Sequence, residues 1–268
     1  MLELAENQTS LLSTATFDQN FNSQPNYIAK IGQPMGMIYG YIYEGTYKYD
    51  DFDKSGSSYT LKGNIPHYVS ESNTQPGMPK YKDLNGDGII DTNDRTMIGR
   101  GLPIHTGGFT NNFEYKGFDL SVFFQWSYGN DVLNANRLFF DSGFQKKREL
   151  NQYASYTNRW TPENPNSDIP AATNSSSNLV ISSRVVEDAS FLRLKTVTLG
   201  YTVPKTFLKK YKIDNARLYV AAQNLWTITG YSGYDPEVSI RSGGLTPGLD
   251  FSSYPRALSV SFGINLGF

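Results

Sequence analysis

The sequence contains no cysteine and only two histidines, His67 and His105. Without cysteine, the chain cannot form a disulfide framework, a thiolate metal site or a cysteine nucleophile. Two histidines are also too few for a histidine-rich catalytic metal centre. We expect both histidines to be solvated side chains or to face a lumen.

Charge of one sign and long apolar runs are missing as well. The chain has 24 Lys and Arg against 25 Asp and Glu, a net charge of −1. This balance, without a basic run, gives no electrostatic reason to expect nucleic-acid binding. No apolar run approaches the roughly 18 residues of a membrane helix. Residues 1–10 lack the basic and apolar regions of a signal peptide. Either the protein is not exported, or its start lies upstream of Met1.

Aromatic residues make up 14% of the chain, so we expect an ordered protein, because disordered chains are poor in aromatics. The clearest pattern is at 257–268, where apolar residues alternate without a break with small or polar ones. Such a period of two is typical of a strand with one apolar face. A membrane-crossing strand needs only about 9–11 residues of this kind. Its apolar positions are Leu258, Val260, Phe262, Ile264, Leu266 and Phe268.

Four earlier segments are also strand-like: 105–115, 118–128, 191–203 and 216–228. The connections alternate in length, with short turns at 116–117 and 204–215 and long excursions at 129–190 and 229–256. Short turns on one side and long loops on the other are typical of outer-membrane barrels. An ordinary β-sandwich gives no reason for this alternation, although a sandwich strand could show the same period of two.

We therefore predict an all-β fold made of antiparallel strands from the C-terminal part of a transmembrane β-barrel. The set is incomplete, about five to seven strands, and carries long extracellular loops. With Phe268 on the periplasmic side, residues 1–103 form a mostly extracellular loop region and 104–268 form the barrel strands and their loops. Residues 37–49 are strand-like, and their pattern fits either a spanning strand or a hairpin within a loop.

Residues 83–94, DLNGDGIIDTND, have the spacing of an EF-hand-like calcium loop. Carboxylate and amide oxygens at alternate positions would converge on a hard cation, and Gly88 permits the sharp turn. Ile90 would hold the loop against the protein. A plain turn rich in Asp and Asn is the alternative. The predicted ligands of a structural Ca²⁺ are Asp83, Asn85, Asp87, Ile89 (through its carbonyl), Asp91 and Asp94.

Several segments, in order, resemble the C-terminal end of SusC/RagA-family TonB-dependent transporters. They are IGQPMGMIYGYIYEG at 31–45, KYKDLNGDGIIDTNDRTMIG at 80–99, FEYKGFDLSVFFQWSYGNDVLN at 113–134, RWTPENPNSDIP at 159–170, ASFLRLKTVTLGYTVP at 189–204 and AAQNLWTITGYSGYDPEV at 221–238. The resemblance implies a barrel of about 22 strands with an N-terminal plug. It also implies import of glycan or peptide fragments across the cell outer membrane and a SusD-like lipoprotein lid. TonB would act only through an N-terminal part that this sequence lacks.

Two other classes of function compete with the transporter interpretation. One is a secreted β-rich glycan-binding or adhesion module that carries a calcium loop. The other is an enzyme, which we do not expect because neither a nucleophile–base pair nor a paired-carboxylate motif is evident. The tyrosines at 39–49 and Trp160 could stack on sugars or simply pack, and the second role is the commoner one. We expect Arg184 and Glu187 to be loop charges.

Overall fold

The computed structural model describes residues 10–13, 25–143, 151–173, 179–240 and 243–268. The chain divides into two compact units. One contains Met1–Leu102, Asp131–Glu187 and Val238–Ser253, and the other contains Pro103–Asn130, Asp188–Glu237 and Tyr254–Phe268. None of the helices in the described part of the chain has the length and hydrophobicity to cross a membrane.

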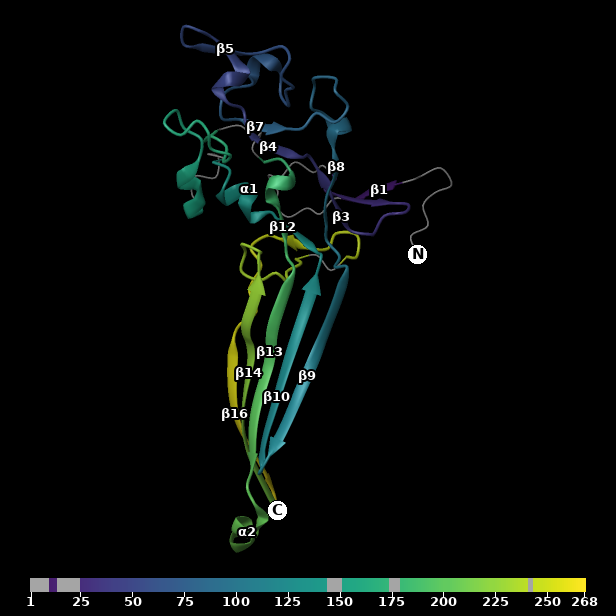
Figure 1. Cartoon of the computed structure of the whole chain (residues 1–268), viewed down its shortest axis with the longest axis vertical. Coiled ribbons are helices and arrows are strands. Elements are labelled where there is room, and N and C mark those ends of the chain that lie inside the picture. Colours follow the sequence, from purple (N-terminus) through teal and green to yellow (C-terminus); the bar gives the residue numbers. More distant parts are fainter. Residues whose placement is uncertain (1–9, 14–24, 144–150, 174–178, 241–242) are drawn as a thin grey trace. The chain divides into compact units, whose positions relative to one another are not determined.

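The second unit is a five-stranded antiparallel sheet, seen in Figure 1 as the set of long arrows. The order β16-β14-β13-β10-β9 places strands that are consecutive within this unit side by side. All five predicted long strands are confirmed, with ends that agree to within a few residues. Their bounds are β9 His105–Tyr115, β10 Phe118–Tyr128, β13 Phe191–Thr202, β14 Asn215–Thr229 and β16 Ser259–Gly267.

The strand register gathers the apolar side chains on one face of this sheet. Phe262 lies opposite Val220, while its neighbour Ser261 lies opposite Ala221 on the other face. Because side chains alternate along each strand, this register extends across the sheet. The apolar face is solvent-exposed in the isolated chain, and the side chain of Phe262 is 82% exposed. Other exposed members are Phe118, Leu192, Leu199, Leu218, Trp226, Ile228, Val260, Ile264 and Leu266.

The strand pairing is irregular at Lys195 on β13 and at Asn224 on β14. On β13, Thr196 pairs with Phe123 and Leu194 with Phe124, so Lys195 has no opposite residue on β10. The bulge shifts the alternation by one residue, so Leu194 joins the apolar face. On β14, Asn224 adopts a positive φ of 54° at the corresponding place. Asparagine tolerates this left-handed conformation better than most residues, which explains why Asn224 interrupts an otherwise apolar series.

The turns at one end of the sheet are short, as predicted. Lys116 and Gly117 both have positive φ, 48° and 86°, as a two-residue type I′ hairpin requires. The connection from β13 to β14 forms a helical turn, α2 (Lys205–Leu208), followed by the 3-10 turn η8 (Lys209–Tyr211). Figure 1 shows α2 beyond the sheet at the same end as the C-terminus.

The first unit consists of short strands and turns. They include β1 Ser10–Ser13, β2 Tyr27–Lys30, β3 Met37–Gly40, β4 Tyr43–Thr46, β5 Phe52–Ser55, β6 Ser58–Leu61, β7 Pro79–Tyr81, β8 Thr96–Arg100, β11 Asp131–Asn134, β12 Val186–Asp188 and β15 Leu249–Asp250, with α1 Asn136–Phe140. Strands β1-β2-β3-β8 form one sheet, and β12-β11-β15 form another in which β11 and β15 run parallel. Residues 37–49 contribute β3 and β4, each four residues long. These are too short to cross a membrane, so 37–49 is not a spanning strand.

The core of the first unit joins segments that are far apart in the sequence. Tyr27, Ile38, Leu133, Val185 and Leu249 are all fully buried in one cluster. These residues come from the N-terminal third of the chain and from both long excursions. The excursions therefore share a hydrophobic core with the early residues and do not behave as separate loops.

Arg184 and Glu187, expected to be loop charges, lie in the 3-10 turn η7 (Ser183–Val185) and in β12, and both form ion pairs. The side chain of Arg184 is 9% exposed and binds the fully buried carboxylate of Asp141 at 3.0 Å. Arg137 binds the same carboxylate at 3.0 Å and Glu187 at 3.4 Å. Burial lowers the pKa of Arg184, while the neighbouring carboxylate favours its charged form. The network therefore ties α1 to the segment that precedes β12.

We expect the two faces of β16 to respond oppositely to a charge. With the sheet in a bilayer, as the strand pattern predicts, Phe262→Arg should cost about 2–4 kcal/mol, because the side chain would enter hydrocarbon near the middle of the strand. The matched variant Ser261→Arg should cost little, since its side chain points to the polar face. Equilibrium unfolding in lipid vesicles measures both values. Equal costs, or the reverse order, would remove the membrane-facing assignment.

Candidate functional site

The acidic loop at 83–94 is held by its own side chains. The Asp83 carboxylate accepts the N–H groups of Gly86 at 2.6 Å and Gly88 at 2.8 Å. The N–H of Gly88 and its neighbours hold the pKa of Asp83 below its usual value. Gly86 and Gly88 have φ angles of 78° and 82°, so the sharp turn predicted at Gly88 is confirmed.

Three further predicted ligands form Asx turns. The side-chain carbonyl of Asn85 accepts the N–H of Asp87 at 3.0 Å, and Asp87 accepts that of Ile89 at 2.8 Å. Asp91 accepts the N–H of Asn93 at 2.7 Å. Each side chain therefore curls the backbone two residues ahead, which is the local effect expected of Asp and Asn in turns.

Asp94 closes the loop. Its carboxylate is fully buried and accepts the N–H of Leu84 at 2.7 Å and that of Asp91 at 2.8 Å. These bonds join the two ends of the loop. The loop is also fixed to the rest of its unit by Ile90, which is buried beside Tyr41 and Tyr81, as predicted.

The loop geometry alone does not assemble a cation site. In the part of the chain that the structure describes, no group of three or more Asp, Glu or His side chains is arranged to hold a metal ion. A carboxylate oxygen that accepts one amide hydrogen keeps a second lone pair, so the hydrogen bonds do not prevent binding. The donor types suit a hard cation, but they would have to turn toward one centre. Calcium binding stays a prediction.

Three of the rings that were candidates for sugar stacking are packing elements. Tyr41 and Tyr47 are 3% and 1% exposed, and Trp160 is 9% exposed. Burial raises the pKa of Tyr41 to about 12. Buried rings cannot offer a face to a sugar, so these three residues are not a stacking platform.

A second cluster, which the sequence did not indicate, lies on the polar face of the long sheet. Arg193 on β13 is 3% exposed and binds Asp235 at 2.6 Å and Glu237 at 3.1 Å. Its Nε also donates to the Thr227 hydroxyl at 3.0 Å. Partial burial acts to raise the pKa of Asp235, but the N–H of Glu237 and the Arg193 guanidinium outweigh it and lower that pKa. The bonds hold the segment after β14 against the polar face.

Two more cations complete this polar-face cluster. Lys195 and Arg256 approach Glu237 at 3.6 and 2.8 Å. A separate pair nearer the short turns joins Arg217 to Asp119, with the Nε–Oδ1 distance at 3.0 Å. A Cβ at Gly200 would collide with both partners of that pair, so glycine is needed there. The polar face therefore carries paired charges in the positions expected of a lumen wall.

The histidines lie in different settings. His105 begins β9 in register with Tyr128, and their rings stack at 5.1 Å. This register puts His105 on the apolar face, where its side chain is exposed, so of the two expected settings, solvated or lumenal, it has the first. His67 pairs through its backbone with the acidic loop, accepting the N–H of Ile90 at 2.9 Å.

Removing the central cation of the polar-face cluster should destabilise the protein. Arg193→Leu would remove the buried cation that pairs with Asp235 and Glu237, and the free energy of unfolding should fall by about 3–5 kcal/mol. Arg256→Gln is the matched control: Arg256 binds the same Glu237 but is 43% exposed, so its loss should cost at most about 1 kcal/mol. Denaturant unfolding of the purified protein in detergent gives both values. If the two variants lose equal stability, the cluster does not depend on Arg193.

Comparison with known proteins identifies relatives in one group. The chain is 37% identical over 254 residues to TonB-dependent receptor P3 of Formosa agariphila, which covers 93% of this chain and 24% of that protein. It is 29% identical over 201 residues to TonB-dependent receptor SusC of Bacteroides thetaiotaomicron, covering 75% of this chain and 18% of that receptor. No family model matches the sequence.

Solved structures agree with these relatives. The RagAB peptide transporter superposes with a TM-score of 0.68 at 25% identity, over 99% of this chain and 25% of that one. The RagAB peptide importer in its closed-closed state gives a TM-score of 0.67 at 25% identity over the same shares. The chain thus spans about a quarter of the length of the proteins it matches. In sequence and in fold, the chain is a SusC/RagA-like segment of a TonB-dependent receptor.

Proposed function

We propose that this chain forms part of the barrel wall of an outer-membrane nutrient importer powered through TonB. The long sheet provides a membrane-facing wall on one side and a polar lumen lining on the other. Residues that precede this region in the complete protein would supply the plug and the contact with TonB. The imported material would be glycan or peptide fragments, with a SusD-like lipoprotein at the extracellular mouth.

The observation that carries this proposal is the exposed apolar face of the five long strands. Each of these strands has between 9 and 15 residues, enough to cross a bilayer. The opposite face carries the paired charges of Arg193 and Arg217. A sheet in a soluble protein normally buries its apolar face and exposes its polar face to water. Here the apolar face is the exposed one, which favours a membrane wall.

The same observation disfavours the secreted glycan-binding module. Such a module would have to leave Phe262, Ile264 and Trp226 in water at 82, 64 and 58% exposure. Contiguous apolar surface of this kind on a soluble protein promotes association. Tyr41, Tyr47 and Trp160 are buried as well, so these three rings offer no face on which a sugar would stack. The proteins it matches are named receptors and transporters, and none of the names reported above describes an enzyme.

The similar proteins do not decide between the two proposed substrate classes, glycan fragments and peptide fragments. SusC and the RagAB peptide transporter are both similar to this chain, and the second is named for peptides. The polar-face cluster sets Arg193, Lys195 and Arg256 against Asp235 and Glu237, which leaves one positive charge in excess. One excess charge beside two carboxylates does not select a strongly charged substrate of either sign.

Growth experiments test the proposed function. We expect deletion of the complete receptor gene to abolish growth on one oligosaccharide or peptide mixture that must cross the outer membrane. Restoring the gene should restore growth, while a gene that lacks residues 259–267 should not, because β16 closes one edge of the five-stranded sheet described above. Loss of TonB should give the same defect. Unchanged uptake of every glycan and peptide supplied would contradict an import role.

A structural Ca²⁺ at residues 83–94 is the second part of the proposal. Titration of the complete receptor with calcium should release or absorb heat, and Asp87→Ala should weaken binding by about tenfold or more, because Asp87 is exposed and central in the ligand spacing. Asp53→Ala, an exposed acid elsewhere in the same unit, is the control. Absence of calcium-dependent heat, or an unchanged titration of Asp87→Ala, would leave the loop as a plain turn.

A further inference from the structure

The turn between β13 and β14, residues 204–214, concentrates positive charge. It contains Lys205, Lys209, Lys210 and Lys212 against a single acid, Asp214, although the whole chain has a net charge of −1. All four lysines are exposed. Within the described residues, none of them forms an ion pair, whereas Arg193 and Arg217 on the polar face of the same unit are both paired with carboxylates.

Aromatic side chains accompany the lysines. Phe207 and Tyr211 are four residues apart, which places them on the same side of a helical turn, and they are 69 and 67% exposed. Leu208 is buried and holds the turn against its own unit. A turn that only connected two strands would have no reason to leave two large rings in water beside unpaired lysines.

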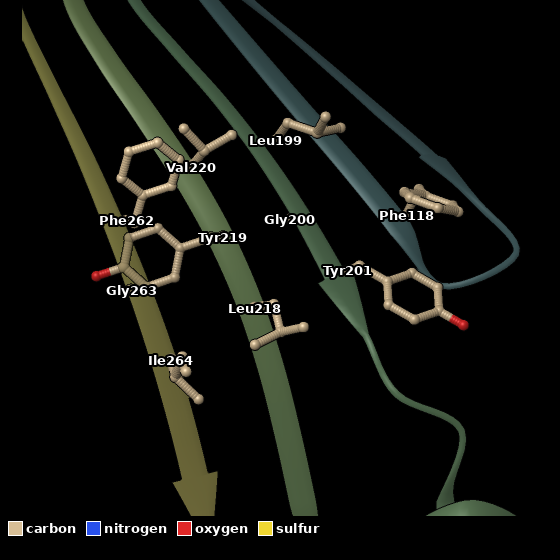
Figure 2. Close-up of a pocket in the computed structure, with 10 residues that line it drawn as sticks. All are labelled: Phe118, Leu199, Gly200, Tyr201, Leu218, Tyr219, Val220, Phe262, Gly263 and Ile264. Carbon is tan, nitrogen blue, oxygen red and sulfur yellow. The ribbon is translucent and has the colours of Figure 1, made fainter.

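The turn continues the apolar face of the sheet. Phe118 and Tyr201 are on that face and border a shallow depression of about 540 Å³. Figure 2 shows Leu218, Phe262 and Ile264 lining the same depression, and the ribbon beyond Tyr201 leads to the helical turn at the lower edge. Along this end, the apolar strand face therefore comes first, the rings of Phe118 and Tyr201 follow, and the turn that carries the four lysines lies beyond them.

This order matches the depth profile of one leaflet of a bilayer. Apolar side chains contact acyl chains, aromatic rings favour the interface, and lysines extend to the phosphates. Tyr115 at the adjacent β9–β10 turn is 69% exposed, with the Lys116 ammonium 5.1 Å from its ring centre. The second turn at this end of the sheet therefore repeats the combination of an aromatic ring and a lysine.

We propose that residues 204–214 form an interfacial anchor that binds anionic phospholipid headgroups through their phosphates. The four lysines attract the negative surface, and Phe207 and Tyr211 enter the interface between headgroups and acyl chains. The anchor fixes the depth at which the sheet sits in the periplasmic leaflet. This inference rests on the proposed outer-membrane wall, and it adds a lipid partner for one turn.

A single fluorescent label tests the anchor: this chain has no cysteine of its own, and any cysteine elsewhere in the complete receptor would be replaced by serine. In the complete receptor, Phe207→Cys would carry a nitrobenzoxadiazole group. The receptor would be placed in vesicles of phosphatidylcholine alone or mixed equally with phosphatidylglycerol. We expect a blue-shifted emission and at least a twofold lower iodide quenching in the mixed vesicles. Combining the label with Lys209→Gln and Lys210→Gln should remove most of the difference, whereas Lys30→Gln, an exposed lysine of the other unit, should not.

A second label separates failure of the anchor from failure of the membrane wall. Leu218→Cys places the same probe on the apolar face, where lipid-borne quenchers should reach it in both vesicle types. Water-like emission at position 207 with lipid-like emission at 218 would overturn the anchor and leave the wall intact. Protection at 207 that is equal in detergent and in both vesicle types would also overturn it, because protein would then cover the turn. Water-like emission at both positions would overturn the wall.

Discussion

Backbone hydrogen bonds between the five long strands determine where every side chain of the second unit points. The pairing of Phe262 with Val220 and of Ser261 with Ala221 is enough to assign both faces of β16. A shift of one residue would move the whole apolar series to the opposite face. The charge pairs on the polar face and the exposed rings on the apolar face both depend on this register.

The same dependence explains what the sequence could reveal about the fold. Period-two alternation is local, so the strands at 105–115, 118–128 and 257–268 were predictable within a few residues. The bulge was not, because Lys195 and Asn224 resemble simple exceptions to the alternation until two strands are paired. Pairing places them side by side: Lys195 is the unpaired residue of β13, and Asn224, with its φ of 54°, is one of two unpaired residues of β14. The alternation therefore reveals the strands, while the structure is needed to show why Leu194 and Val197 share a face.

Only a site whose residues are close together in the sequence could be predicted from the sequence. The acidic loop was recognisable because its side chains act on the backbone two to five residues away. The polar-face cluster was not, because Arg193 reaches Asp235 across 42 residues and Glu237 across 44. A clue was present in the position of Arg193 between two leucines of a strand. A buried arginine requires an acid, but sequence alone does not say which of the 25 acids supplies it. Folding of the segment after β14 back onto the sheet decides the pairing.

The two edge strands of the sheet need further strands as partners before the sheet can lie in a membrane. β9 and β16 are the outer members of the described five-stranded order. Each therefore has one side whose N–H and C=O groups receive no partner from this sheet. In hydrocarbon every such group costs several kcal/mol, because no water replaces the missing bond. Single-chain bacterial barrels have at least about eight strands, and wide ones have many more. The apolar face can thus enter a membrane only when further strands pair with both edges. This is consistent with a chain that spans about a quarter of its relatives.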